Sequence, residues 1–229
     1  FTSTYSTGSP YSEGCGSSAD TVTTATTHPA NRNYYYMTTA TIGNCVTRLG
    51  SSILSGCQIL SSVTLGNSVA EIGNEAFKNC VSLSSITIPN SVTTIGNYVF
   101  EECSKITAMT LPNSVTSIGI GAFRNCSGIT SVNIPSGITG ISGNTFDGCS
   151  GLTSIDIPSG VTAIGNYAFN GCISLASITV RATTPPTLGN NYVFRNTNNC
   201  PIYVPYSSVN TYKSASGWSN YASRIQAIP

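Results

Sequence analysis

A 23-residue step between cysteines constrains the fold of this chain more than any other feature. Phenylalanines keep the same step from Phe77 to Phe169, and prolines keep it from Pro89 to Pro158. A fixed period of this length indicates a protein built from stacked, repeated units. The cysteines of the series are Cys57, Cys80, Cys103, Cys126, Cys149 and Cys172.

Aligned on these residues, the unit has the form L-x-x-I-x-I-P-x-x-V-x-x-I-G-x-x-A-F-x-x-C. The first unit is degenerate, because Gly43 and Leu54 stand where the others have Pro and Phe. The seventh unit is stretched around Pro185 and Pro186. Residues 202–205 repeat the strand pattern once more and predict a closing eighth strand. The seven units start at Met37, Leu60, Leu83, Ile106, Ile129, Leu152 and Leu175.

Each part of the unit predicts a local structure. Residues 85–88 alternate polar and apolar side chains, which is typical of a short, half-buried strand. Pro89 ends that strand because proline cannot donate to a strand ladder. Residues 92–95 predict a second short extended segment. Residues 98–103 are too short for an independent helix and suit one helical turn that directs its phenylalanine and cysteine inward.

A lone unit cannot bury enough of its apolar surface, so neighbouring units have to stack. We therefore expect a repeat solenoid over residues 37–205: a β-rich, right-handed leucine-rich-repeat solenoid with short parallel strands and single helical turns. Its open ends would expose the core, so we expect a cap at each end. Residues 1–36, including Tyr34–Tyr36, would cap one end and residues 206–229 the other. The side chains expected to close that second end are Val209, Tyr212, Trp218, Tyr221 and Ile225.

The repeat unit closely resembles the BspA-like leucine-rich repeats of bacteria. The match covers about residues 37–205, and the tail from Val209 to Ile225 resembles the closing segment of that family. The resemblance implies a cell-surface or secreted protein of the bacterial type, with a role in adhesion to proteins or to other cells. It brings no catalytic residues. Residues 1–36 lie outside the resemblance.

The low charge of the chain disfavours two classes of partner. The formal net charge is +1 and only 7% of residues are charged, whereas nucleic acids and anionic membranes select basic surfaces. We expect no nucleic-acid partner. No run of 18 or more apolar residues exists, so we expect no membrane insertion by this segment. The neutral, hydroxyl-rich surface is common in bacterial surface proteins, which agrees with an extracellular or cell-surface location.

The cysteine column has three interpretations: disulfides, a metal site or free core thiols. Parallel side chains on neighbouring turns stand about 5 Å apart, farther than the Cβ atoms of a disulfide. Metal ligands converge on a point, which a line of thiols does not do. We therefore predict free, buried thiols. Cys15 and Cys45 lie off the column, and a bridge between them is left open.

Charged residues follow the phenylalanine column with alternating sign. This series is a ligand-binding stripe or, as we predict, an exposed ladder that keeps neighbouring repeats in register. Its members are Lys78, Glu101, Arg124 and Asp147, and the uncharged Asn170 follows in the next repeat.

The outward positions of the strands are the candidate partner-binding site. They form two polar columns, and a plain solvated face is the alternative to a recognition surface. Ice binding, which uses regular hydroxyl arrays, is disfavoured because Ala108, Asn133 and Asp156 interrupt the pattern. The candidate partner-binding residues are Ser85, Thr87, Thr110, Ser131, Asn133, Ser154 and Asp156.

The sequence offers no support for catalysis. His28 is the sole histidine and stands in a Thr-rich stretch before Pro29, so a metalloprotease motif cannot form and no other histidine is available for a Ser-His or Cys-His pair. We predict no enzyme activity, no cofactor and no metal site. The leading hypothesis is an adhesin-like binding module that recognises a protein or glycan. The alternative is a structural spacer within a larger surface protein.

Overall fold

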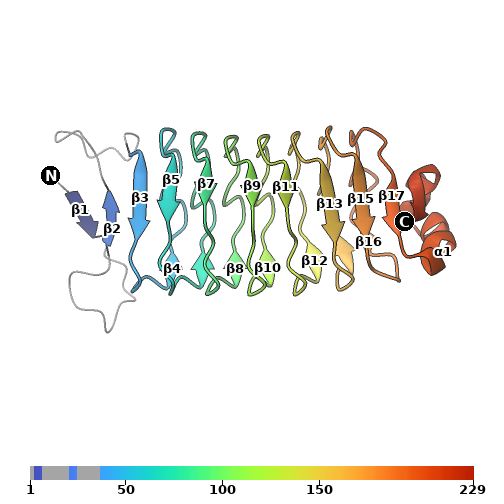
Figure 1. The fold of residues 1–229 in the computed structure, drawn as a ribbon, viewed down its shortest axis with the longest axis horizontal. Helices are drawn as coiled ribbons and strands as arrows, with labels where there is room; N and C mark the ends of the chain where they lie inside the picture. The colour runs from blue at the N-terminus through green and yellow to red at the C-terminus, as the bar shows by residue number, and fades with distance from the viewer. Residues whose placement is uncertain (1–2, 7–20, 25–36) are drawn as a thin grey trace.

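A computed structural model of the chain describes residues 3–6, 21–24 and 37–229. Figure 1 shows the turns of the chain side by side in one row, with β1 and β2 at one end and the C-terminal helices at the other. Every turn repeats the same path, and this confirms the predicted repeat solenoid of short parallel strands.

One wall of the solenoid, which we call the strand face, carries the first strand of each repeat. Ser62 of one repeat is opposite Ser85 of the next, so the register between neighbours equals the sequence period. Hydrogen-bonded ladders join β3-β5-β7, β9-β11 and β13-β15-β17-β18, and the three groups lie side by side. The strands are β3 (Thr39–Ile42), β5 (Ser62–Thr64), β7 (Ser85–Ile86), β9 (Ala108–Met109), β11 (Ser131–Val132), β13 (Ser154–Ile157), β15 (Ser177–Val180), β17 (Ile202–Val204) and β18 (Ile225–Ala227).

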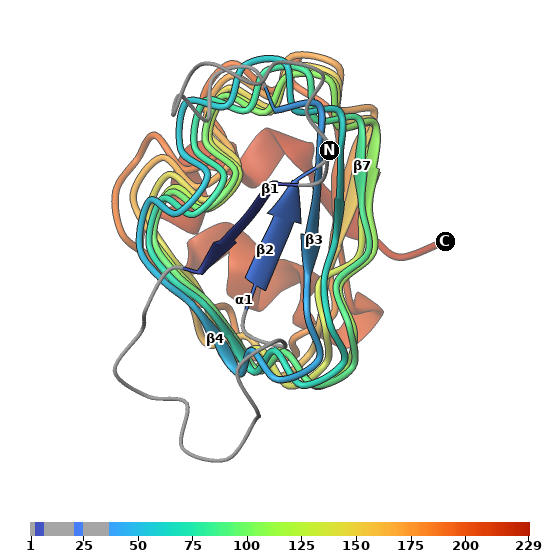
Figure 2. The ribbon, with the colours of Figure 1, turned by 90° about the vertical axis from the view of Figure 1, so that its left-hand side faces the viewer.

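A second wall is made by the second extended segment that the sequence predicts. Figure 2, an end-on view, shows it across the solenoid from the strand face. Its strands form two parallel sheets, β4-β6-β8-β10 and β12-β14-β16. They are β4 (Arg48–Leu49), β6 (Glu71–Ile72), β8 (Thr94–Ile95), β10 (Ser117–Ile118), β12 (Gly140–Ile141), β14 (Ala163–Ile164) and β16 (Thr187–Leu188).

The third side of each turn differs in detail from the helical turn expected for residues 98–103. The backbone N–H groups of Tyr98, Phe100 and Glu102 donate to carbonyls of the following repeat, at 2.8, 2.8 and 2.9 Å. Tyr98 and Glu102 adopt positive φ angles of 55° and 65°. A helix directs its N–H groups along its own axis, whereas this alternation turns every second N–H along the solenoid. The segment is therefore a third hydrogen-bonded ladder, which we call the turn ladder.

The core is a set of identical side chains stacked at the repeat spacing. Phe100 and Phe123 have ring centroids 5.5 Å apart with planes 10° from parallel, and the stack runs from Phe77 to Phe194. All of these rings are buried. Offset-stacked rings add stabilisation beyond the area that they bury, so this column joins the repeats into one body.

The cysteine column confirms the prediction of free core thiols. Cys57, Cys80, Cys103, Cys126, Cys149, Cys172 and Cys200 are free and buried. From Cys80 to Cys172, each thiol of the column donates to a carbonyl 26 residues earlier; Cys103 Sγ, for example, lies 3.1 Å from the Phe77 oxygen. Burial raises the pKa of the Cys57 thiol to about 11 and that of Cys80 to about 12.

The C-terminal segment covers the end of the core. It contains η2 (Tyr206–Ser208), α1 (Val209–Ser214) and η3 (Trp218–Arg224). Trp218 packs on Phe194, the last ring of the stack, and its Nε1 donates to the Pro186 carbonyl at 2.7 Å. Tyr212 is fully buried beside Trp218, and its hydroxyl donates to the Ala182 carbonyl. These bonds satisfy the polar atoms of both rings inside an apolar cap.

At the other end, β1 (Ser3–Ser6) and β2 (Thr21–Thr24) extend the strand face. They pair antiparallel with each other, and β2 pairs antiparallel with β3. Cys45 is disulfide-bonded. Cys15, its candidate partner in the sequence, lies outside the described residues, as does the expected tyrosine cap at Tyr34–Tyr36.

Candidate interaction surface

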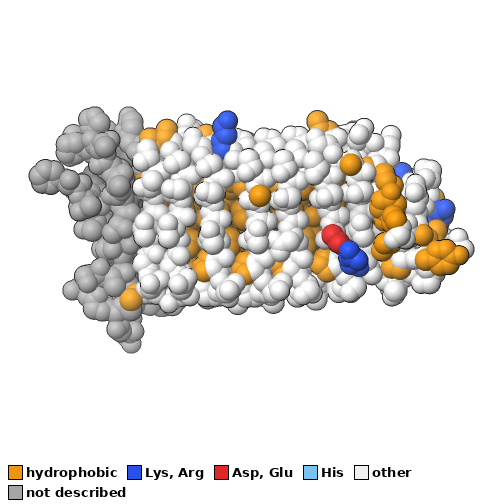
Figure 3. Space-filling view, in the orientation of Figure 1, with side chains coloured by type: hydrophobic (Ala, Val, Ile, Leu, Met, Phe, Trp, Pro, Cys, Tyr) orange, Lys and Arg blue, Asp and Glu red, His pale blue; other side chains and the backbone are white. Residues whose placement is uncertain are grey.

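The structure places all seven candidate partner-binding residues on the strand face, and all seven are exposed. Strand pairing aligns them across repeats: Ala108 is opposite Ser131, and Asp156 is opposite Thr179. Figure 3 shows this wall as a broad surface on which charged side chains are few. The residues are Ser85, Thr87, Thr110, Ser131, Asn133, Ser154 and Asp156.

Hydroxyl groups near this face fall into two classes. Those that stand immediately before the strands donate to carbonyls of the preceding repeat; Thr153 Oγ1, for example, donates to the Thr130 carbonyl at 3.0 Å. Ser61, Ser84 and Thr130 do the same. By contrast, the Ser and Thr hydroxyls of the two outward columns bond to no group in the described part of the chain. Those outward hydroxyls keep their full hydrogen-bonding capacity for a ligand.

Asn133 is a candidate whose side chain already has a structural role. Its Oδ1 accepts from the Leu111 N–H and its Nδ2 donates to the Leu111 carbonyl, both at 2.8 Å. The amide thus pairs with the backbone of the neighbouring repeat beyond the end of the β9-β11 ladder. Only part of its hydrogen-bonding capacity remains for a partner.

Asp156 is paired with Arg181, a residue that the sequence analysis did not single out. Arg181 Nε and Nη2 lie 2.6–2.9 Å from the two carboxylate oxygens, in the fork geometry favoured by guanidinium. Both side chains are more than half exposed. Arg181 stands where the other repeats have Pro89, Pro112, Pro135 and Pro158, and this break in the proline column is the signal that could have identified it.

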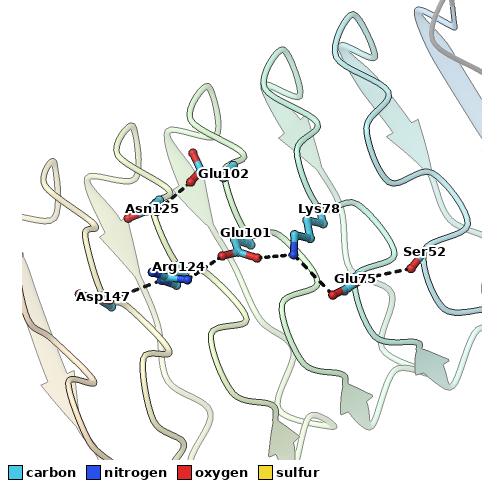
Figure 4. Close-up of polar contacts among 8 residues, drawn as sticks. All are labelled: Ser52, Glu75, Lys78, Glu101, Glu102, Arg124, Asn125 and Asp147. Carbon is cyan, nitrogen blue, oxygen red and sulfur yellow. Dashed lines mark hydrogen bonds and ion pairs between the residues drawn. The ribbon is translucent and has the colours of Figure 1, made fainter.

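The alternating charges lie on the turn ladder, away from the strand face. Figure 4 shows them meeting as a chain of contacts across neighbouring repeats. Lys78 Nζ and Arg124 Nη1 each lie 3.0 Å from a different oxygen of Glu101. Hydrogen bonding to Glu101 raises the pKa of Lys78. The predicted contact between opposite charges is confirmed.

The sequence analysis predicted that these alternating charges are exposed. This was wrong for Glu101, whose side chain is 8% exposed. A carboxylate is buried here because two cations from adjacent repeats neutralise it. The chain of contacts continues to Asp147, whose Oδ1 accepts from the Asn170 amide. These contacts are internal to the protein, which favours the predicted register-keeping ladder over a ligand-binding stripe.

Two further findings concern metals and membranes. Within the described residues, no three His, Cys, Asp or Glu side chains gather where they could hold a metal ion. No helix in the same residues has the length and apolar character needed to cross a membrane.

The repeat pattern matches a known family over most of the chain. The BspA type leucine-rich repeat region matches in six copies, over residues 30–153 and 139–216. The chain belongs to this family. In the unit L-x-x-I-x-I-P, the two outward columns are the two x positions that flank the first I, so their side chains can vary without disturbing the core.

Solved structures of other proteins share the fold. The T. pallidum leucine-rich repeat protein TpLRR is 27% identical with a TM-score of 0.50, over 60% of this chain and 78% of its own. A leucine-rich cell surface protein of Faecalibacterium prausnitzii A2-165 is 25% identical with a TM-score of 0.51, over 85% of this chain and 64% of its own.

A third structure is more distant. The pneumococcal vaccine antigen PcpA is 17% identical with a TM-score of 0.51, over 83% of this chain and 40% of its own, and it supports the fold alone. The chain thus spans less than two thirds of the Faecalibacterium protein and of PcpA. A comparison with curated proteins found no match.

Proposed function

We propose that this chain is a non-enzymatic binding module of an adhesin type, displayed on a bacterial surface or secreted, which recognises a protein or glycan through its strand face. The observation that carries the proposal is the contrast between the two classes of hydroxyl. Hydroxyls beside the strands are used in the fold, whereas those of the outward columns are exposed or partly exposed and have no partner in the described residues. Such an array of hydroxyls is available to form hydrogen bonds with a ligand.

The proposed location rests on the family and on the Faecalibacterium protein, which is described as a cell surface protein. A single hydrogen bond made by a surface hydroxyl contributes about 0.5–1.5 kcal/mol. Strong adhesion would therefore depend on many contacts along the solenoid, or on display of many copies.

A structural spacer is the second candidate. The continuous phenylalanine stack and the ladders on three sides join the repeats into one body, as a spacer requires. The two candidates differ in what they predict for the strand face, because a spacer needs no free hydroxyls there.

Binding of the purified protein to arrays of extracellular-matrix proteins and glycans would test the proposal. We expect specific binding that is lost in a Thr87→Lys/Thr110→Lys variant, which places bulky charges on the strand face. The matched control is Ser117→Lys/Ala163→Lys, which adds the same charge to exposed positions of the second wall. Binding should fall only modestly with added salt, because the face is nearly uncharged. Equal binding by the two variants, both folded, would show that the strand face is not the site.

A further inference from the structure

Within residues 37–229, most polar aromatic side chains are engaged within the fold. From the C-terminal cap, Trp218, Tyr212 and Tyr221 donate hydrogen bonds to backbone carbonyls of the stretched seventh repeat. The remaining engaged rings lie on the turn ladder: Tyr167 stacks on Tyr192, Arg195 covers Tyr192, and Lys78 lies over Tyr98.

Tyr203 and Tyr206 are the exceptions. Within the described residues, neither ring stacks on another ring or a cation, and neither hydroxyl has a hydrogen-bond partner. Tyr206 is 86% exposed, and Tyr203 is partly exposed on β17. Figure 3 shows hydrophobic side chains gathered over β17 and the beginning of the C-terminal cap, beside the acidic and basic pair on the strand face.

Strand pairing gives the positions of these groups. Asp156 is opposite Thr179, and Thr179 is opposite Tyr203, so the three follow one another along a single outward column. Each step is about 4.8 Å, which places the backbones of Asp156 and Tyr203 about 10 Å apart. Arg181 follows Thr179 by two residues. Side chains two residues apart on an extended segment point to the same side, so Arg181 and Thr179 share this face. Gln226, opposite Tyr203 on β18, is exposed at the end of the column.

These groups retain hydrogen-bonding capacity after the fold is made. Arg181 uses its Nε–H and one N–H of Nη2 to hold Asp156, which leaves both N–H groups of Nη1 and one of Nη2. The hydroxyls of Thr179 and Tyr203 are free of partners in the described residues. The arginine charge is balanced by Asp156, so the cluster as a whole is neutral.

We propose that Tyr203, with Thr179 and Arg181, forms a binding subsite for a neutral oligosaccharide at the C-terminal end of the strand face. A sugar ring offers C–H groups that pack on an aromatic ring and hydroxyls that pair with a guanidinium, an amide or another hydroxyl. The pattern of one free ring among such donors and acceptors matches that ligand. A protein interface would require a larger apolar centre, whereas the rest of this face is hydroxyl-lined.

This inference rests on the proposed function and specifies its ligand. The probes are neutral hexasaccharides of β-linked glucose, xylose, mannose and N-acetylglucosamine, with an acidic galacturonic acid oligomer for comparison. They are titrated at millimolar concentrations into isotope-labelled protein and followed by NMR. We expect at least one neutral probe to shift the signals of Thr179, Arg181 and Tyr203, and to leave those of the turn ladder unchanged.

Variants test the role of the ring. Tyr203→Ala should weaken binding about tenfold or more, and Tyr203→Phe, which keeps the ring, should weaken it much less. Arg181→Gln should also weaken binding, because it removes the donors of Nη1. Tyr192→Ala is the matched control, since it removes an exposed tyrosine from the turn ladder. Spectra of each variant report whether it is folded, and the partly exposed position of Tyr203 favours a folded protein.

Three results would overturn the subsite: no shift with any neutral probe, shifts confined to another surface, or equal affinity in Tyr203→Ala. None of these results decides the proposed function, which is tested separately by the arrays. A protein ligand that is lost in Thr87→Lys/Thr110→Lys, in the absence of any response to the sugars, would refute the glycan subsite and retain the strand face. Binding of the acidic oligomer alone would refute the neutral ligand class.

Discussion

The ring of Tyr98 occupies the space in which a side chain at Gly121 of the next repeat would lie. Gly121 also has a positive φ of 60°. The side chain that a repeat can accommodate at this position thus depends on the residue at the same position in the neighbouring repeat.

This relationship predicts that Gly121→Ala destabilises the protein by about 2 kcal/mol or more, from both backbone strain and the clash with the ring. In a Tyr98→Ala background the clash is absent, and the same change should cost only about 1 kcal/mol. Chemical denaturation of the four proteins of this cycle measures both values. Equal costs in the two backgrounds would show that the ring and the glycine are not coupled.

The inward and outward columns differ in their effect on stability. Phe123→Ala removes a fully buried ring from the stack and should cost about 3–5 kcal/mol. Thr110→Ala, on the strand face, should cost under about 1 kcal/mol. Equal losses in denaturation experiments would contradict the assignment of the two columns.

The buried carboxylate of Glu101 should matter more than an exposed one. Glu101→Gln leaves Lys78 and Arg124 without their shared partner and should cost about 1–3 kcal/mol. The control is Glu71→Gln, since Glu71 pairs with Arg48 at the surface, where the loss should be under about 1 kcal/mol. A smaller loss at Glu101 than at Glu71 would contradict a role for burial.

The thiols can be counted directly. Native protein should react slowly with thiol reagents near neutral pH, because the column is buried and its pKa values are raised. After denaturation without reductant, the seven free thiols of residues 37–229 should react, and Cys45 should become reactive only after reduction. Two or fewer reactive thiols would mean that the column is bridged.

The same thiols predict a loss of stability in alkaline solution. Burial raises their pKa in the folded state, so the unfolded state loses its thiol protons first as the pH rises above about 9. The contribution of these thiols to the free energy of unfolding is full below that pH. It falls as the pH approaches 11–12, the pKa values of Cys57 and Cys80 in the folded state. Each buried thiol can contribute up to about 1.4 kcal/mol per pH unit to that fall. A Cys103→Ala/Cys126→Ala variant should show a shallower decline in denaturation midpoints between pH 9 and 11.

The period of the sequence determined which residues share a column, and alternation within each strand determined which columns face inward. For this reason the core, the free thiols, the contacts between opposite charges and the exposed candidate face were all predictable. In a solenoid, residues one period apart become neighbours, so long-range contacts follow from a local pattern.

Only the tertiary structure decided how deeply each group is buried and which partner it bonds. The turn ladder depends on positive φ angles at Tyr98 and Glu102, which the residue types do not require. The burial of Glu101 and the pairing of Asp156 with Arg181 depend on where the charged groups of side chains from neighbouring repeats lie in space. The isolation of Tyr203 is the outcome of the same packing. The sequence sets the neighbours of a residue, whereas the geometry between neighbours decides which hydrogen bonds and ion pairs they can form.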